Sequence, residues 1–154
     1  MNQPSPNQTR VVVGMDFSPA AKKAARLALE AARRMGARVE LIHVWEPPQL
    51  LHADVMVWTD GGEHSLVDLA RAASATQFEA LLAELGAEPP PTTRFCVGHA
   101  ADVLTRESAV PGTSLLFVGA HGDTWLERAL VGSVANQLLR TAACPVLTVR
   151  NGNA

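Results

Sequence analysis

Short apolar runs alternate with segments of helical periodicity along this chain, and this alternation limits the folds open to it more than any other feature. Strands are predicted at residues 10–15, 38–45, 92–98, 115–118 and 146–149. Helices are predicted between them, at residues 19–35, 64–85, 101–110 and 132–142. Strands that alternate with helices form a parallel sheet with helices on both faces, so we predict a doubly wound α/β fold with a single five-stranded parallel sheet.

The strand order predicted for this sheet is 3-2-1-4-5, although the sequence leaves other orders open. In the predicted order the sheet reverses between its first and fourth strands, and ligands bind at such a point, outside the carboxyl ends of the strands. Asp16 follows the first strand and Gly119 ends the fourth. These two residues are therefore expected to flank one crevice.

The connection at residues 46–63 is long, and it contains Trp58 and the sequence Asp60-Gly61-Gly62. A plain connection of this length is uncommon, so we expect a mobile lid or a disordered loop. The helix after it is predicted to turn one apolar face inward. The residues of that face are Leu66, Ala70, Phe78, Leu81, Leu82 and Leu85.

Composition places the chain among soluble globular proteins, because 47% of its 154 residues are apolar and 18% are charged. We predict a disordered tail at residues 1–9 and one domain at residues 10–150. The net charge of −2 comes without a block of like charge, which argues against nucleic acid as a partner. Because no apolar run reaches the ~18 residues of a membrane span, and residues 1–10 lack an apolar signal core, we expect a cytoplasmic protein without a membrane partner.

The two cysteines, Cys96 and Cys144, lie far apart in the sequence, and each is within or beside an apolar segment. We interpret them as reduced thiols in the core, with a disulfide or a metal pair as the alternative.

The stretch with the clearest binding chemistry is Gly-Ala-His-Gly at 119–122, followed after nine residues by Gly-Ser-Val-Ala at 132–135. A glycine at the end of a strand lets the backbone approach a ligand closely. The start of the next helix offers free N–H groups at the positive end of the helix dipole, which is an arrangement that binds phosphate. The alternative is that Ser133 only caps its own helix.

This spacing resembles the G-x2-G-x9-G-[ST] pattern of the ATP-binding branch of the universal stress protein family. Residues 144–150 (Cys-Pro-Val-Leu-Thr-Val-Arg) are similar to the end of that family's sequences. Residues 13–19 and 41–44 are similar to its first two strand segments. The likeness covers residues 10–150, and it implies a regulatory protein of the stress response that binds ATP and acts on a protein partner that the sequence does not identify.

The resemblance also implies roles for individual residues. Asp16 would accept hydrogen bonds from the ribose or neighbouring polar atoms, and Val44 would offer backbone groups to adenine. The alternative for Asp16 is a turn or helix-start residue favoured by the helix dipole. Val44 taken alone is better explained as a core residue. The full set of expected binding residues is Asp16, Val44, Gly119, His121, Gly122, Gly132, Ser133, Val134 and Ala135.

Two carboxylates, Asp123 and Glu127, follow the second glycine of the pattern. A carboxylate near a triphosphate weakens binding unless Mg²⁺ lies between them. His121 lies inside the glycine loop, and we interpret it as a loop spacer or a neighbour of the phosphates.

Motifs for dedicated catalysis are lacking in the sequence. It contains neither a G-x-x-x-x-G-K-[ST] phosphate loop nor a G-x-S-x-G elbow around Ser133, and its histidines have no metal-ligand spacing. We therefore predict no catalytic residue and no metal site. The alternatives are an enzyme of the same fold that hydrolyses adenine nucleotides or transfers adenylate, and a nucleotide-free dimeric interaction module.

The last strand is expected to form a homodimer interface. In the predicted order, residues 146–149 form an exposed edge of the sheet, and they are β-branched or apolar and uncharged. Such an edge favours pairing with another strand, and two copies related by a twofold axis would pair antiparallel. Relatives in the family that the sequence resembles associate through this strand. The alternative is that residues 151–154 fold over the edge.

Overall fold

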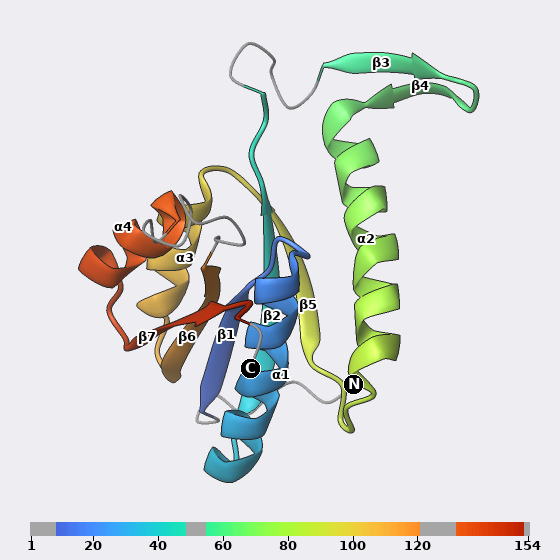
Figure 1. The fold of residues 1–154 in the computed structure, drawn as a ribbon. Coiled ribbons are helices and arrows are strands. Elements are labelled where there is room, and N and C mark those ends of the chain that lie inside the picture. Colours follow the sequence, from blue (N-terminus) through green and yellow to red (C-terminus); the bar gives the residue numbers. More distant parts are fainter. Residues whose placement is uncertain (1–8, 49–54, 121–131, 153–154) are drawn as a thin grey trace.

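Three consecutive valines, Val11, Val12 and Val13, are completely buried in the first strand, β1 (Arg10–Gly14). Successive side chains of a strand point to opposite faces of a sheet, so both faces beside β1 must be covered. The computed structural model, which describes residues 9–48, 55–120 and 132–152, shows how they are covered (Figure 1).

The main sheet has five parallel strands in the order β5-β2-β1-β6-β7. Its other four strands are β2 (Arg38–Trp45), β5 (Thr92–Val97), β6 (Thr113–Ala120) and β7 (Val146–Arg150). Numbered by their order along the chain within this sheet, the strands follow the order 3-2-1-4-5. The predicted order and the doubly wound fold are therefore confirmed.

Helices cover both faces of the sheet. Helices α1 (Pro19–Met35) and α2 (Leu66–Leu85) lie on one face, and α3 (Ala100–Ser108) and α4 (Ser133–Thr141) lie on the other. Each face has its own apolar cluster, because alternate residues of the same strands supply them. The first cluster includes Val11, Val13, Leu41, Phe78 and Phe117, and the second includes Val12, Ile42, Leu104, Leu116 and Leu138.

Local sequence explains where the first helix begins and ends. The hydroxyl of Ser18 accepts a hydrogen bond from the N–H of Ala21 (3.2 Å), and Pro19 occupies the first helical position, where its missing N–H costs nothing. Gly36 ends the helix in the left-handed conformation (φ 63°), and Gly86 ends α2 in the same way (φ 55°). The predicted ends of both helices are confirmed.

The connection after β2 differs from the prediction. The loop expected at residues 46–63 contains two antiparallel strands, β3 (Met56–Thr59) and β4 (Gly62–Ser65), while residues 49–54 lie outside the described part of the chain. The sequence Asp60-Gly61 forms their turn, and the Thr59 hydroxyl accepts a hydrogen bond from Gly61 N–H (3.3 Å). An Asp-Gly pair is typical of a tight hairpin turn, but the second strand, Gly-Glu-His-Ser, has no apolar run, and the loop prediction was wrong here.

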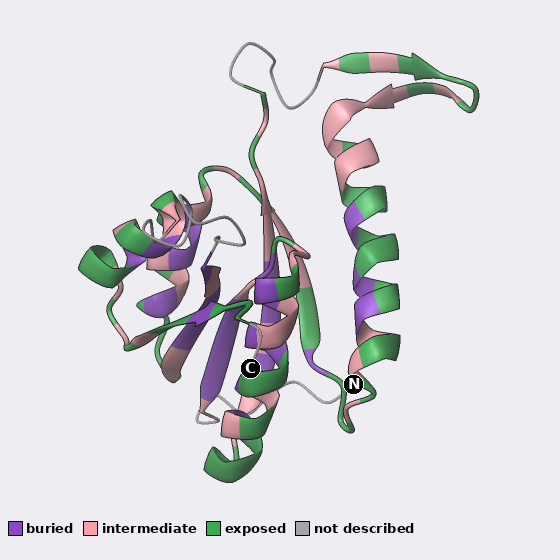
Figure 2. Cartoon of the chain, in the orientation of Figure 1, coloured by how far each residue is buried: buried purple, intermediate pink, exposed green. Residues whose placement is uncertain are grey.

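Helix α2 also begins and packs differently from the prediction. It begins at Leu66, two residues later than expected, because the hydroxyl of Ser65 caps it by accepting from Asp68 N–H (3.2 Å). Only Phe78 and Leu81 of the predicted inward face are buried, together with Ser74 (Figure 2). Its N-terminal end reaches past the sheet toward the β3–β4 hairpin, so Leu66 is only partly buried.

None of the described helices is both long enough and apolar enough to cross a membrane. Of the predicted tail at residues 1–9, residues 1–8 lie outside the described part of the chain.

Candidate functional site

A cavity of about 200 Å³ lies at the carboxyl ends of the strands, where the order of the sheet reverses between β1 and β6. It brings together seven of the nine residues expected at a binding site. These are Asp16, Val44, Gly119, Gly132, Ser133, Val134 and Ala135. The other two, His121 and Gly122, lie outside the described residues, as do Asp123 and Glu127.

The turn between β1 and α1 holds Asp16 in a constrained position. One oxygen of its carboxylate accepts a hydrogen bond from the N–H of Ser18 (3.0 Å). Phe17, between them, adopts the left-handed conformation (φ 61°), which is unfavourable for a bulky residue. Its ring packs against those of Phe78 and His43, each with its centroid 5.0 Å away, and this packing compensates for the strain.

His43, near the end of β2, fixes the same turn from the other side. Its Nδ1 lies 2.7 Å from the carbonyl oxygen of Met15, so Nδ1 carries the proton and donates it. The N–H of Met15 in turn donates to the carbonyl of Ile42 (2.8 Å). Sequence reasoning did not assign this positioning role to His43, because the two residues are brought together only by the pairing of β1 with β2.

Two glycines at the cavity let helices pack closely against the strands that carry them. A Cβ on Gly119 would lie 2.7 Å from the backbone nitrogen of Ala21 in α1. A Cβ on Gly14 would lie 2.8 Å from Cδ1 of Leu104 in α3. Gly119 is therefore needed for the packing of α1 against β6, whereas the sequence suggested only close approach to a ligand.

Helix α4 presents its first amides to the cavity. Its N-cap is Gly132, and the first helical hydrogen bond runs from Asn136 N–H to the carbonyl of Gly132 (2.9 Å). The N–H groups of Ser133, Val134 and Ala135 thus have no acceptor within the helix. Ser133 is the first helical residue and not the cap, so the alternative that it caps its own helix was wrong.

The opposite wall of the cavity is formed by α3, whose N-terminus is fixed by an unexpected residue. The N-cap position, His99, makes no side-chain capping bond, and Glu46 from the end of β2 accepts from the N–H of Ala100 (2.7 Å). A carboxylate at this end of a helix also interacts favourably with its dipole. Ala100 and Leu104, one turn later, both line the cavity.

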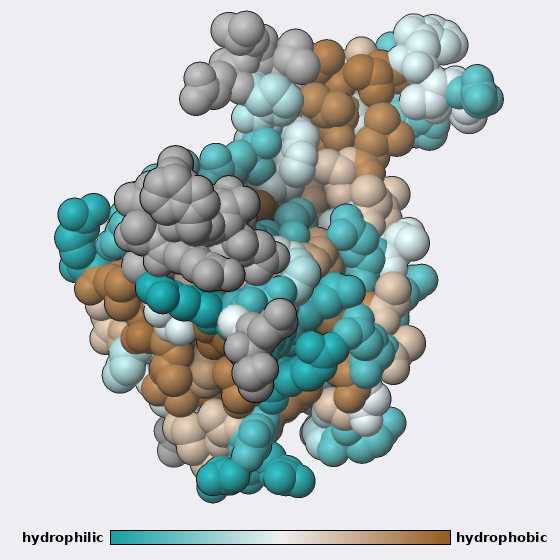
Figure 3. Space-filling model, in the orientation of Figure 1, coloured by the Kyte–Doolittle hydropathy of each residue, from teal (hydrophilic) through white to brown (hydrophobic). Residues whose placement is uncertain are grey.

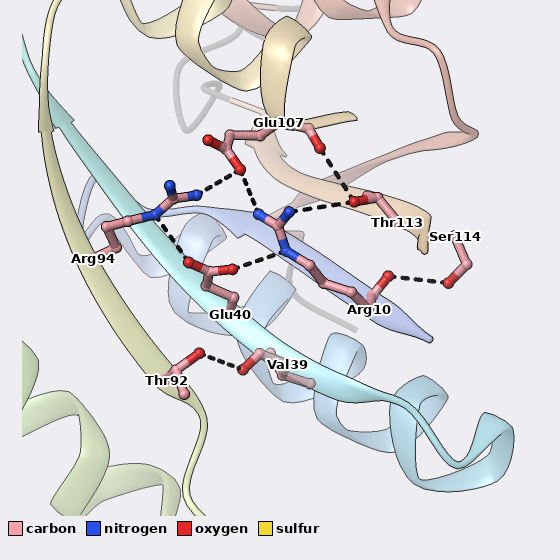
Figure 4. A network of polar contacts seen from close by, with 8 residues as sticks. All are labelled: Arg10, Val39, Glu40, Thr92, Arg94, Glu107, Thr113 and Ser114. Atoms are coloured by element: carbon pink, nitrogen blue, oxygen red, sulfur yellow. Dashed lines mark hydrogen bonds and ion pairs between the residues drawn. The ribbon is translucent and has the colours of Figure 1, made fainter. Parts of the chain in front are cut away.

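Four charged side chains join the other end of α3 to the sheet (Figure 4). Glu107 of α3 lies 2.5 Å from both Arg10 of β1 and Arg94 of β5, and Glu40 of β2 lies between the same two arginines at 2.8 and 2.9 Å. The Nε groups of both arginines are at ion-pair distance from Glu40 but are not aimed well enough to form hydrogen bonds. Burial alone would raise the pKa of Glu107, but hydrogen bonds from Arg94 and Arg10 outweigh it and hold that pKa below its usual value.

Cys96 and Cys144 are free, half-buried thiols that pack against the apolar cluster beneath α3 and α4. Burial raises the pKa of both. Within the described ranges, His, Cys, Asp and Glu side chains do not gather into a group of three that could hold a metal ion.

Comparison with known proteins connects this chain to one family. Residues 8–150 match the model of the universal stress protein family. A universal stress protein of Mycobacterium tuberculosis, Rv2623, is 30% identical over 148 residues, which cover 92% of this chain and 47% of that protein. The chain therefore spans about half the length of this curated relative.

Solved structures show the same fold. The universal stress protein UspA from Lactobacillus plantarum is similar with a TM-score of 0.68 and 23% identity, covering 94% of this chain and 99% of that one. A universal stress protein solved in complex with cAMP has a TM-score of 0.61 and 23% identity, covering 95% and 99% of the two chains.

Proposed function

The chain belongs to the universal stress protein family, and on this premise we propose that the cavity between β1, β6 and the start of α4 binds an adenine nucleotide. The observation that carries the proposal is the juxtaposition of an apolar cavity with three helix amides that have no helical acceptor. The apolar part suits a base, and the amides suit phosphate oxygens. The relative bound to cAMP supports the same ligand class.

Each wall of the cavity has a role in this proposal. Ile42, Val44 and Leu104 contact the base, and the backbone of Val44 offers it hydrogen bonds. Asp16 accepts hydrogen bonds from the ribose, since a carboxylate is an acceptor only. The amides of residues 133–135 and the Ser133 hydroxyl hold the phosphates, and His121 and Gly122 complete the phosphate loop.

The proposed ligand is ATP. Asp123 and Glu127, which lie outside the described residues, are the carboxylates that would hold Mg²⁺, and the ion would offset their charge near a triphosphate. Occupancy of the site changes the conformation presented to a protein partner in a cytoplasmic stress response. The role is regulatory, and the residues around the cavity serve binding and not turnover.

The functional unit is a homodimer that pairs through β7. This strand is an edge of the sheet, and Leu147 is 40% exposed on it. Leu116 N–H donates to the carbonyl of Pro145 (3.0 Å), so the backbone of Pro145 faces β6. Backbone groups of successive residues in a strand point in opposite directions, so those of Val146, Thr148 and Arg150 point away from β6. These outward groups are available to a second β7.

Ser133→Asp tests the nucleotide site without weakening the helix. A carboxylate in the first turn interacts favourably with the α4 dipole, by about 0.3–1 kcal/mol, so the variant should be at least as stable as the parent. The same carboxylate repels phosphate. By calorimetry we expect ATP affinity to fall by about tenfold or more while adenosine affinity stays unchanged.

Ala73→Asp is the matched control, because it adds the same charge on an exposed position of α2. It should leave both affinities unchanged. Equal ATP affinity in Ser133→Asp and Ala73→Asp would show that phosphate does not bind at the start of α4.

A further inference from the structure

The hairpin of β3 and β4 projects from the N-terminal end of α2, away from the five-stranded sheet (Figure 1). Its large apolar side chains are open to solvent: Trp58 is 80% exposed and Met56 is 50% exposed. Hydrophobic surface gathers over the hairpin and the start of α2, with polar surface at the turn (Figure 3). Exposed tryptophan of this kind marks a contact site more often than a stabilising one.

One edge of β3 lacks a partner strand in the part of the chain that the structure describes. Leu66 N–H donates to the carbonyl of Val55 (2.8 Å), and these residues continue the β3–β4 register. Residue pairs of an antiparallel ladder alternate between hydrogen-bonded and non-hydrogen-bonded. Val57 therefore also bonds to β4, whereas the backbone N–H and C=O groups of Met56 and Trp58 point away from β4. The open edge therefore offers two N–H and two C=O groups, and β3 has neither a lysine nor a proline to block it.

The Asp and Glu side chains near this edge give it a negative charge. Between Arg38 and Arg71 the sequence contains no lysine or arginine. The described residues 55–70 carry Asp60, Glu63 and Asp68. Glu63 lies directly opposite Trp58 in the hairpin, so its side chain is on the same face. Two copies of this hairpin would bring like charges together, which disfavours self-pairing.

We propose that the open edge of β3 binds an extended segment of a partner protein, in which basic and apolar residues alternate. The segment adds a third strand to the hairpin. Its backbone bonds to Met56 and Trp58. Because successive side chains of a strand point to opposite faces, its cations lie on the face of Trp58 and Glu63, and its apolar side chains lie beside Val57 on the other face. This surface is separate from the nucleotide cavity, and the inference does not depend on the proposed function.

The probe is a fluorescently labelled hexapeptide of alternating lysine and valine, titrated with the full chain and followed by anisotropy. Met56→Pro removes an outward N–H at the first residue of β3, where proline leaves the internal ladder intact. Glu63→Lys reverses the charge beside Trp58. We expect each variant to weaken peptide binding by about tenfold or more. Binding should also weaken as salt rises.

Glu79→Lys is the matched control, since it makes the same charge change on an exposed part of α2 outside the hairpin. It should bind like the parent. A peptide that is N-methylated at every backbone amide keeps the charges and side chains but has no backbone N–H groups, and it should not bind. Slow hydrogen exchange at Leu66 N–H will show whether the hairpin persists in Met56→Pro. If the hairpin is lost in that variant, Glu63→Lys still tests the contribution of charge, and the N-methylated peptide still tests strand pairing.

Three results would overturn the proposal. One is binding of the peptide to Glu63→Lys as tight as to Glu79→Lys. Another is binding of the N-methylated peptide as tight as that of the unmethylated peptide, which would show that strand pairing plays no part. Equally tight binding of a glutamate–valine peptide would show the same for charge. The third is self-association of the parent that Met56→Pro abolishes, which would assign the edge to a second copy of this chain.

Discussion

Gly119 shows how one residue serves both packing and the candidate site. Its backbone lines the cavity, while the position of its missing Cβ faces the first turn of α1, 2.7 Å from Ala21 N and 3.1 Å from the carbonyl carbon of Ala20. These are backbone atoms, which cannot move aside as the end of a flexible side chain can. Glycine is therefore required at this position whether or not a ligand binds.

Gly119→Ala should lower the free energy of unfolding by about 1–3 kcal/mol, because the added methyl group forces α1 away from β6. Urea denaturation measures the change. Gly152→Ala is the control, since a Cβ there meets open space, and it should leave the stability unchanged. An unaltered midpoint in Gly119→Ala would contradict the close approach of α1.

For single residues, the sequence predicted that Asp16 and Ser133 lie at one crevice, and both line the cavity. Ser133 belongs to a spacing pattern within one segment, whereas Asp16 was placed by the predicted strand order, and their binding roles stay predictions. The sequence was not sufficient for His43 or Glu46. Their partners, Met15 and Ala100, lie 28 and 54 residues away, and only the pairing of strands brings them together. Contacts of this kind leave no local signal.

Among the elements, α3 is held at both ends by charged side chains of the sheet. Glu46 fixes its N-terminus, and Glu107 joins its last turn to Arg10 and Arg94 (Figure 4). Contacts between Thr105 and Thr141 (2.8 Å) join it to α4 as well. The two helices that form opposite walls of the cavity are therefore connected through the polar side chains of α3.

The lowered pKa of Glu107 predicts a dependence of stability on pH. A carboxyl whose pKa is lower in the folded state stabilises the fold above its unfolded value, about 4.5, and this contribution is lost as pH falls through the folded pKa. Urea denaturation of the parent and of Glu107→Gln should therefore show a difference in stability at pH 7 that shrinks below about pH 4.5.

Glu79→Gln, at an exposed position of α2, is the control for this experiment and should follow the parent across the range. If the difference between the parent and Glu107→Gln stayed constant down to pH 3, Glu107 would not be held ionised by the arginines.

The elements of the main sheet were predictable because buried parallel strands appear as apolar runs bounded by turn residues. Residues 11–13 and 115–118 are of this kind. The hairpin at β3 and β4 was not recognised, because its apolar residues face solvent and were interpreted as a loop. The Asp60-Gly61 pair was the one local signal of a turn, and the polar sequence of β4 gave no sign of a second strand. More residues of α2 were predicted to face inward than are buried, since the N-terminal end of that helix extends beyond the sheet.

For the whole molecule, the open edge of β7 determines the expected assembly. Thr148→Pro removes an N–H that points away from β6, so it should leave the fold intact and prevent pairing with a second copy. Sedimentation velocity should give a dimer for the parent and a monomer for the variant.

Thr148→Val is the control, because it keeps both the N–H and the β-branched side chain, and it should remain dimeric. A parent that sediments as a monomer at micromolar concentration would contradict dimerisation through β7.

The most direct test of the central claim is a two-dimensional ¹⁵N–¹H NMR titration of the parent with ATP and Mg²⁺, followed by the same titration with adenosine. The account predicts that the amides of Ser133, Val134 and Ala135 shift strongly with ATP, whereas with adenosine the shifts concentrate near Val44 and Leu104. Saturation with ATP that leaves the amides of residues 133–135 unmoved, or no shift at any ATP concentration, would contradict it.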